Sequence, residues 1–219
     1  VSKLSEITGS GEATYNFGLL PDFLSVFADN NRKNKEVIFA WTNLWTSTYS
    51  HSGTIVPYFL FPPGLVGTVT QTLYGTTPGF YNLYESTDIR RNVTAMARYL
   101  SLPAGDSIIY DFSANRYRNE TQGGYIVGNT LLPYTGLAYS KFGRTPLAAS
   151  QASVPTDYST DLIQMRFSDV LLCLAEALNE TGQTAQAVPF LNRVRERANA
   201  SQYPLGSQDE VRAQIRKER

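Results

Sequence analysis

The chain has 219 residues, which is enough for one large domain or two small ones with a buried core. Its 19 Lys and Arg side chains balance 19 Asp and Glu side chains, so no net charge attracts a nucleic acid. A single cysteine, Cys173, excludes an internal disulfide, and with one histidine it cannot build the usual kind of zinc site. We therefore expect no nucleic-acid partner, no metal and no cofactor.

Composition divides the chain near residue 160. Residues 161–219 hold 16 of the 38 charged side chains, whereas residues 1–160 hold 24 of the 27 Phe, Tyr and Trp residues. We expect residues 1–160 to form a loop-rich, aromatic-rich region and residues 161–219 to form a helical region. The last residues still read as a running helix, so we interpret the helical region as truncated and the chain as part of a longer protein.

The first 160 residues carry irregular signals for secondary structure. Residues 22–29 are compatible with a short helix, and residues 36–41 read as a strand. Residues 88–100 are compatible with a helix or a long strand. Turn residues bound two short extended segments, at residues 123–133 and 134–143. This pattern predicts irregular α+β structure.

The helical region gives the clearest pattern. From Phe167 to Leu178, apolar residues recur at i, i+3, i+4, i+7, i+8 and i+11, which predicts one amphipathic helix. Gly182 predicts its end, because glycine adopts left-handed dihedrals at low cost. A second helix follows. Proline is tolerated in the first turn of a helix, so Pro189 predicts that this helix begins near Ala187.

A third helix is predicted by a capping box. Ser207 and Glu210 have the spacing at which each side chain binds the backbone amide of the other residue. Two helices joined by a glycine-containing turn are the unit of tetratricopeptide-like solenoids, and one unit cannot bury its apolar stripe alone. The predicted fold class is therefore mainly α with irregular α+β insertions: tetratricopeptide-like helix pairs plus a loop-rich, aromatic-rich module.

A series of motifs runs through the helical region in a fixed order. Arg166-Phe167 is followed by Asp169, a leucine-rich stretch, Ala-Glu-Ala-Leu-Asn at residues 175–179, Gly182, and Asn-x-Val-Arg-x-Arg-Ala at residues 192–198. This order resembles the C-terminal helical motif of the SusD/RagB family, with Phe167 where tyrosine is usual. Weaker similarity covers residues 34–39, which resemble the family's Glu-Val/Ile-Ile-Phe strand. Tyr84 with residues 88–91 also resembles the family's Asp-Pro-Arg element, with isoleucine in place of proline.

The resemblance implies a function that composition alone does not give. Proteins of this family are non-enzymatic lipoproteins on the extracellular side of the outer membrane. They bind an oligosaccharide or another nutrient and deliver it to a SusC-like TonB-dependent transporter. Cys173 lies inside the helical stripe, so the lipid anchor implied by the resemblance would lie outside this chain.

An uncharged, aromatic-rich segment is the predicted ligand-binding region. Residues 37–84 contain no Lys, Arg, Asp or Glu but hold eleven aromatic residues, and their prolines and glycines exclude a membrane span. A pyranose stacks its apolar face on Trp or Tyr, while its hydroxyls bind amides. The alternative is that these rings are core residues. The predicted ligand-binding residues are Trp41, Asn43, Trp45, Tyr49, Tyr58, Tyr74, Tyr81 and Asn82.

Two other functions stay open at this point. One is a helical-repeat scaffold that binds a protein partner and no sugar. The other is a glycoside hydrolase, whose retaining form needs two carboxyl groups about 5 Å apart. No Gly-x-Ser-x-Gly motif surrounds any serine, and His51 is the only histidine, so we predict no catalytic residue.

Overall fold

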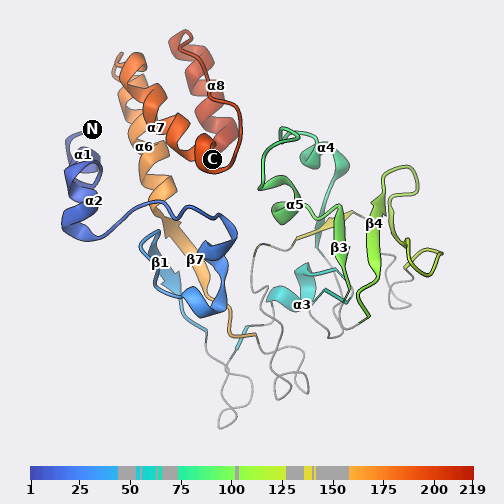
Figure 1. Cartoon of the computed structure of the whole chain (residues 1–219). Helices are drawn as coiled ribbons and strands as arrows, with labels where there is room; N and C mark the ends of the chain where they lie inside the picture. The colour runs from blue at the N-terminus through green and yellow to red at the C-terminus, as the bar shows by residue number, and fades with distance from the viewer. Residues whose placement is uncertain are drawn as a thin grey trace. The chain divides into compact units, whose positions relative to one another are not determined.

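The computed structural model shows helices, short strands and turns in two compact units (Figure 1). The first unit comprises Val1–Val26, Lys33–Trp41 and Ile163–Arg219, and the second Phe27–Arg32 and Thr42–Leu162. The structure describes residues 1–43, 53–54, 56–62, 64–65, 74–101, 104–126, 136–139, 141 and 158–219.

The compact units do not coincide with the two regions of different composition. The first unit contains residues 1–26 and 33–41 as well as nearly all of the helical region. Strand pairing explains this, because strand β7 (Leu162–Arg166) leads directly into the first helix of that region and lies beside strand β1 (Val37–Trp41) (Figure 1). β1 confirms the strand predicted at residues 36–41. The division of the sequence at residue 160 stays a prediction.

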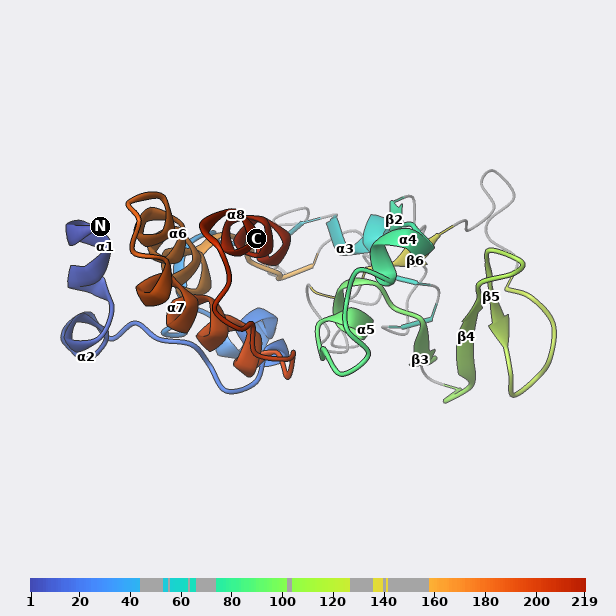
Figure 2. The same ribbon diagram turned by 90° about the horizontal axis from the view of Figure 1, so that it is seen from above.

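Three helices follow β7. They are α6 (Phe167–Glu180), α7 (Thr184–Arg197) and α8 (Gln208–Glu218), and all three pack against one another (Figure 2). Gly182, in the turn before α7, has a φ of +77°, as its prediction as a helix terminator requires. At the start of α8 the backbone N–H of Ser207 donates to Glu210 Oε2 over 2.8 Å, which confirms the capping box.

The predicted start of α7 is wrong. The helix begins at Thr184 instead of near Ala187, which places Pro189 at its sixth residue. Proline at that position removes the hydrogen bond to the carbonyl of Ala185 and costs about 3 kcal/mol in a helix interior. Packing compensates for this cost, because side chains of the same helix such as Leu191 are completely buried.

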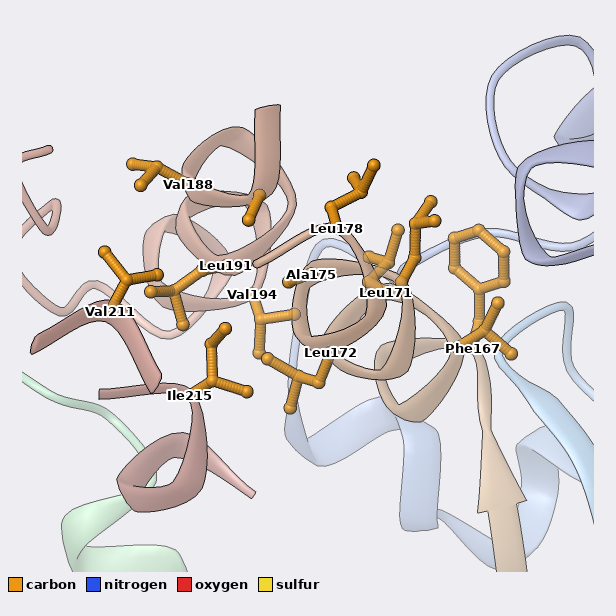
Figure 3. Close-up of a cluster of buried hydrophobic side chains, with 13 residues drawn as sticks. Phe167, Leu171, Leu172, Ala175, Leu178, Val188, Leu191, Val194, Val211 and Ile215 are labelled. Carbon is orange, nitrogen blue, oxygen red and sulfur yellow. The ribbon is translucent and has the colours of Figure 1, made fainter. Parts of the chain in front are cut away.

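The hydrophobic core of the first unit lies between α6, α7 and α8 (Figure 3). Side chains of α6, among them Leu172 and Ala175, face Leu191 and Val194 of α7, and Ile215 of α8 completes the cluster. Helix α1 (Ser2–Ile7) packs against α6 and against α2 (Ser10–Tyr15). The N-terminal segment thus supplies helical partners from within the first 160 residues.

A buried carboxylate ties this core to β1. Glu36, just before the strand, is 0% exposed and accepts hydrogen bonds from Arg166 Nη1 (3.2 Å), Arg197 Nη1 (2.8 Å) and the backbone N–H of Leu20 (2.8 Å). The buried ring of Phe23 lies 5.1 Å from the guanidinium carbon of Arg197 and 5.8 Å from that of Arg166. The charges are therefore paired with each other and also face an aromatic ring.

The second unit is built from short elements. Its three-stranded sheet is antiparallel in the order β3-β4-β5, and β2 pairs with β6 in a separate ladder. Its elements are η2 (Asp29–Asn31), α3 (Val56–Leu60), β2 (Gly75–Thr76), α4 (Pro78–Tyr81), α5 (Arg91–Thr94), β3 (Arg98–Leu100), β4 (Ser107–Asp111), β5 (Arg116–Asn119) and β6 (Leu137–Ala138).

Two predicted elements differ from the observed ones. Residues 88–100 form neither one helix nor one strand but the single turn α5 followed by β3, because the N–H of Met96 leaves the helix to bind the carbonyl of Ala138 (2.9 Å). Within residues 22–29 the helix is the short 3₁₀ segment η1 (Leu24–Phe27). Of the extended segments predicted at 123–143, the structure describes β6 and a bridge between Tyr125 and Arg118.

Two tyrosines attach β6 to the three-stranded sheet. The hydroxyl of Tyr117 donates to the carbonyl of Met96 (2.6 Å) and accepts from the N–H of Ala138 (2.9 Å). The hydroxyl of Tyr110 accepts from the N–H of Gly136 (3.2 Å). Burial raises the pKa of both phenols, so both remain neutral hydrogen-bonding groups at physiological pH. The buried polar groups of β6 are thereby satisfied without a longer ladder.

Replacing Glu36 tests how much the first unit depends on its buried ion pairs. Glu36→Gln leaves two guanidinium groups beside a neutral amide, and we expect the free energy of unfolding to fall by about 3–5 kcal/mol. Urea denaturation followed by circular dichroism measures the change. Glu6→Gln is the matched control, since Glu6 pairs with Lys3 at the surface and its loss should cost less than about 1 kcal/mol. Similar losses for both variants would contradict this role of Glu36.

Candidate functional site

The structure describes six of the eight predicted ligand-binding residues. Trp45 and Tyr49 lie outside the described residues, as does His51. Trp41 belongs to the first unit, so it is not grouped with the others. The remaining five belong to the second unit, and they are Asn43, Tyr58, Tyr74, Tyr81 and Asn82.

Three rings of the second unit form a cluster at α3. Phe59 packs edge-on against Tyr58, with ring centroids 5.3 Å apart, and against Tyr74, at 6.3 Å. The backbone N–H of Tyr74 donates to the carbonyl of Phe59 over 3.2 Å. Tyr58 is half-buried, but Tyr74 is 62% exposed. Tyr74 is therefore a ring that is supported from one side and open to solvent on the other.

The segment after Tyr74 presents an exposed amide. Thr77 caps α4 by accepting from the N–H of Phe80 (3.2 Å), and Pro78 occupies the first helical position, which is where threonine and proline are favoured. Asn82 follows the helix and is exposed, so its amide can donate and accept hydrogen bonds. Phe80 contributes a further partly exposed ring, stacked edge-on against Tyr84 at 5.6 Å.

Tyr81 is held inside the second unit. It is 9% exposed, and the guanidinium carbon of Arg91 lies 4.0 Å from its ring centroid. Its hydroxyl donates to Oδ1 of Asn92 over 3.2 Å, and Phe112 packs against the ring at 5.4 Å. These contacts join α4 to α5 and to the end of β4, so they give Tyr81 a structural role.

The side chain of Asn43 also has a structural role. Its Nδ2 donates to the carbonyl of Thr160 (3.0 Å), and its backbone N–H donates to Oδ1 of Asp161 (3.3 Å). Arg32 binds both the Asp161 carboxylate and the Asn43 carbonyl. Asn43 therefore fastens the segment after β1 to the segment before β7.

In the first unit, β1 exposes two rings on one face. Phe39 and Trp41 are 53% and 60% exposed, and they share a face because side chains alternate along a strand. Ile38 points to the other face and packs against the core. Trp41 is among the predicted ligand-binding residues and Phe39 is not, although the period of two along a strand pairs them.

Two more exposed rings lie outside the uncharged segment of residues 37–84. Phe112 and Tyr125 are 45% and 44% exposed and flank the hairpin of β4 and β5. The hydroxyl of Tyr125 donates to Oδ2 of Asp111 over 2.8 Å, and Oδ1 of Asp111 accepts from the hydroxyl of Ser113 over 2.6 Å. The Asp-x-Ser sequence of this turn, next to an aromatic residue, is the signal that could have identified the hairpin.

The described residues contain neither a metal-binding cluster nor a membrane-spanning helix. Among them, no cluster of three or more His, Cys, Asp or Glu side chains is arranged to hold a metal ion. No helix in the described ranges is both long enough and apolar enough to cross a bilayer. What the described surface offers instead is aromatic rings beside amides and hydroxyls, a set of groups suited to an uncharged polar ligand with an apolar face.

The hydrogen bond between Asp111 and Tyr125 predicts a linked titration. Hydrogen bonds from Ser113 and Tyr125 lower the pKa of Asp111, and the same bond raises the pKa of Tyr125. The stabilisation from Asp111 is therefore present above its unfolded pKa of about 3.9 and is lost as the pH falls through its folded value. In Asp111→Asn we expect the pKa of Tyr125 to fall toward about 10.

Nuclear magnetic resonance titration of the Tyr125 ring measures this shift. Asp22→Asn is the control, because Asp22 bonds only its local turn at Leu24 and Ser25 among the described contacts, and the Tyr125 titration should not move. An unchanged Tyr125 titration in Asp111→Asn would show that the bond does not form in solution.

Known proteins similar to this chain agree with the family resemblance of the motifs at residues 166–198. The model of the SusD family matches residues 5–219. A curated relative, SusD-like protein P2 from Formosa agariphila, is 30% identical over 234 residues, which cover 96% of this chain and 41% of the relative. The chain thus spans about two fifths of the length of the curated relative that it matches.

Solved structures show the same fold. A SusD superfamily protein from Bacteroides fragilis superposes with a TM-score of 0.68 at 22% identity. The match covers 99% of this chain and 43% of the Bacteroides chain. Surface glycan-binding protein A from Bacteroides thetaiotaomicron, in complex with laminarihexaose, superposes with a TM-score of 0.66 at 20% identity and covers 98% of this chain and 45% of its own.

Proposed function

The chain belongs to the SusD family, and we propose that the protein binds a glycan through exposed aromatic rings. The observation that carries this proposal is the cluster at α3, where Phe59 supports the exposed ring of Tyr74. A protein with the same fold has been solved in complex with laminarihexaose, which adds support. The zero net charge of the chain also suits a ligand that is held by stacking and hydrogen bonds.

Each residue of the proposed site has a distinct role. Tyr74 stacks on the apolar face of a pyranose. Phe59, which itself packs against Tyr58, holds the Tyr74 ring in place, and the amide of Asn82 binds sugar hydroxyls. Trp41, on β1, is a further proposed stacking residue in the first unit.

The other predicted site residues have different parts in this proposal. Trp45 and Tyr49 remain predicted contacts outside the described residues. Asn43 and Tyr81, whose side chains already bond within the protein, would act by shaping the site.

The family also suggests a setting for this activity. We propose that the whole protein is a lipid-anchored component of the extracellular side of the outer membrane, which hands its glycan to a SusC-like TonB-dependent transporter. In this proposal α6, α7 and α8 are tetratricopeptide-like helices, and the protein performs no catalysis. Family membership supports each of these statements.

Tyr74→Ala tests the stacking role. A glycan microarray identifies a bound oligosaccharide, and isothermal titration calorimetry then measures its affinity for each variant. We expect Tyr74→Ala to weaken binding about three- to tenfold, which corresponds to the loss of one aromatic stacking contact. Tyr15→Ala is the matched control, because Tyr15 is 56% exposed on α2 of the first unit and should leave the affinity unchanged.

A second variant tests the wider aromatic surface. Replacing Trp45 and Tyr58 together by alanine should also weaken binding, and unchanged affinity would remove both residues from the site. If the protein binds no glycan on the array, the proposed function fails, and the alternative of a helical scaffold for a protein partner would be favoured.

A further inference from the structure

The three-stranded sheet of the second unit has one buried and one exposed face. Tyr99, Ile108 and Tyr117 are buried, and their neighbours along each strand point to the opposite side. The register places Arg98, Ile109 and Arg118 in one row across the sheet, and Asp111 opposite Arg116 in another. Arg116 and Arg118 are two residues apart on β5, so both lie on the exposed face.

Tyr125 lies across β5 on this exposed face. It forms an isolated antiparallel bridge with Arg118, and bridge partners place their side chains on the same face. Its hydroxyl donates to Asp111 on β4, the strand beyond β5. The ring must therefore pass over β5, between the row of Arg118 and the row of Arg116. The hydrogen bond to Asp111 raises the pKa of Tyr125, and the charges of Arg118 and Arg116 oppose that rise, in agreement with this position.

The carboxylates near these arginines are already engaged. Asp111 accepts from the hydroxyl and N–H of Ser113, from the N–H of Ala114 (3.1 Å) and from Tyr125. Glu120 lies 3.3 Å from Arg98 but 3.9 Å from Arg118. Arg116, opposite Asp111, makes no ion pair within the part of the chain that the structure describes. Among the described residues, one face thus carries an aromatic ring held by Asp111 beside two guanidinium groups, of which Arg118 has its anionic partner only at 3.9 Å and Arg116 has none.

We propose that Arg116, Arg118 and Tyr125 form a subsite for the anionic group of an acidic sugar, either a carboxylate or a sulfate ester. This inference rests on the proposed function and narrows the class of glycan. The planar guanidinium group presents parallel N–H donors to two oxygens of such an anion, and the pyranose stacks on the adjacent ring. Because Asp111 already holds the phenol, binding costs little side-chain entropy at that residue.

The sharpest test removes both charges. We expect Arg116→Gln combined with Arg118→Gln to weaken binding of an acidic oligosaccharide about tenfold or more while leaving a neutral one unaffected. Calorimetry with oligogalacturonate, sulfated carrageenan oligosaccharide and neutral laminarihexaose separates a carboxylate from a sulfate and both from a neutral chain. Arg98→Gln is the matched control, since Arg98 lies on the same face at the far strand and pairs more closely with Glu120.

A change at the ring separates stacking from charge. Tyr125→Ala should weaken acidic oligosaccharide binding although both arginines remain, and raising the salt concentration should weaken binding to the unmodified protein but change little in the double variant. The inference is overturned if the protein binds neither acidic probe, or if the double variant binds the acidic probe as tightly as the unmodified protein does. Binding of neutral glycans alone would leave the proposed function intact, whereas binding of no glycan would overturn both.

Discussion

The buried carboxylate of Glu36 is the contact on which the first unit depends. It joins the start of β1 to the end of β7 through Arg166 and to the end of α7 through Arg197. These three residues lie in the sequence motifs that resemble the SusD family: the Glu-Val-Ile-Phe strand, the Arg-aromatic pair and the Val-Arg-x-Arg motif. Motifs more than 120 residues apart therefore meet in one ion-pair cluster, which gives their order a physical reason.

Alternate arginines on α7 connect that helix to three other parts of the first unit. Arg193 pairs with Glu12 at 2.7 Å, Arg195 with Glu218 at 2.9 Å, and Arg197 with Glu36 at 2.8 Å. The side chains of Arg195 and Arg197 are only 7% and 6% exposed, whereas that of Arg193 is 37% exposed. The two buried pairs favour one arrangement of α8 and of the segment before β1 around α7, because breaking either pair leaves a buried charge without its partner.

Local sequence patterns predicted those elements whose structure depends mainly on neighbouring residues of the same segment. The sequence predicts the apolar stripe of α6, its glycine terminator and the capping box of α8, because each depends on residue spacing within one segment. The sequence did not predict the start of α7, because the burial of residues such as Leu191 outweighs the preference of Pro189 for the first turn of a helix. The sequence also could not predict which aromatic side chains are exposed to solvent. Tyr74 and Tyr81 lie in the same uncharged segment, yet Tyr81 is buried through tertiary contacts such as that with Arg91, whereas Tyr74 is exposed.

The exposed rings of the second unit share one physical property. Tyr74 is held by the edge of Phe59, and Tyr125 by a hydrogen bond to Asp111, so each ring presents a surface that is already fixed. A ring fixed before binding loses little further entropy when a sugar stacks on it, and this increases the affinity available from a small contact area. In a chain with no net charge, the proposed selection among glycans would then depend on local polar groups of the second unit, such as the guanidinium groups of Arg116 and Arg118 beside Tyr125.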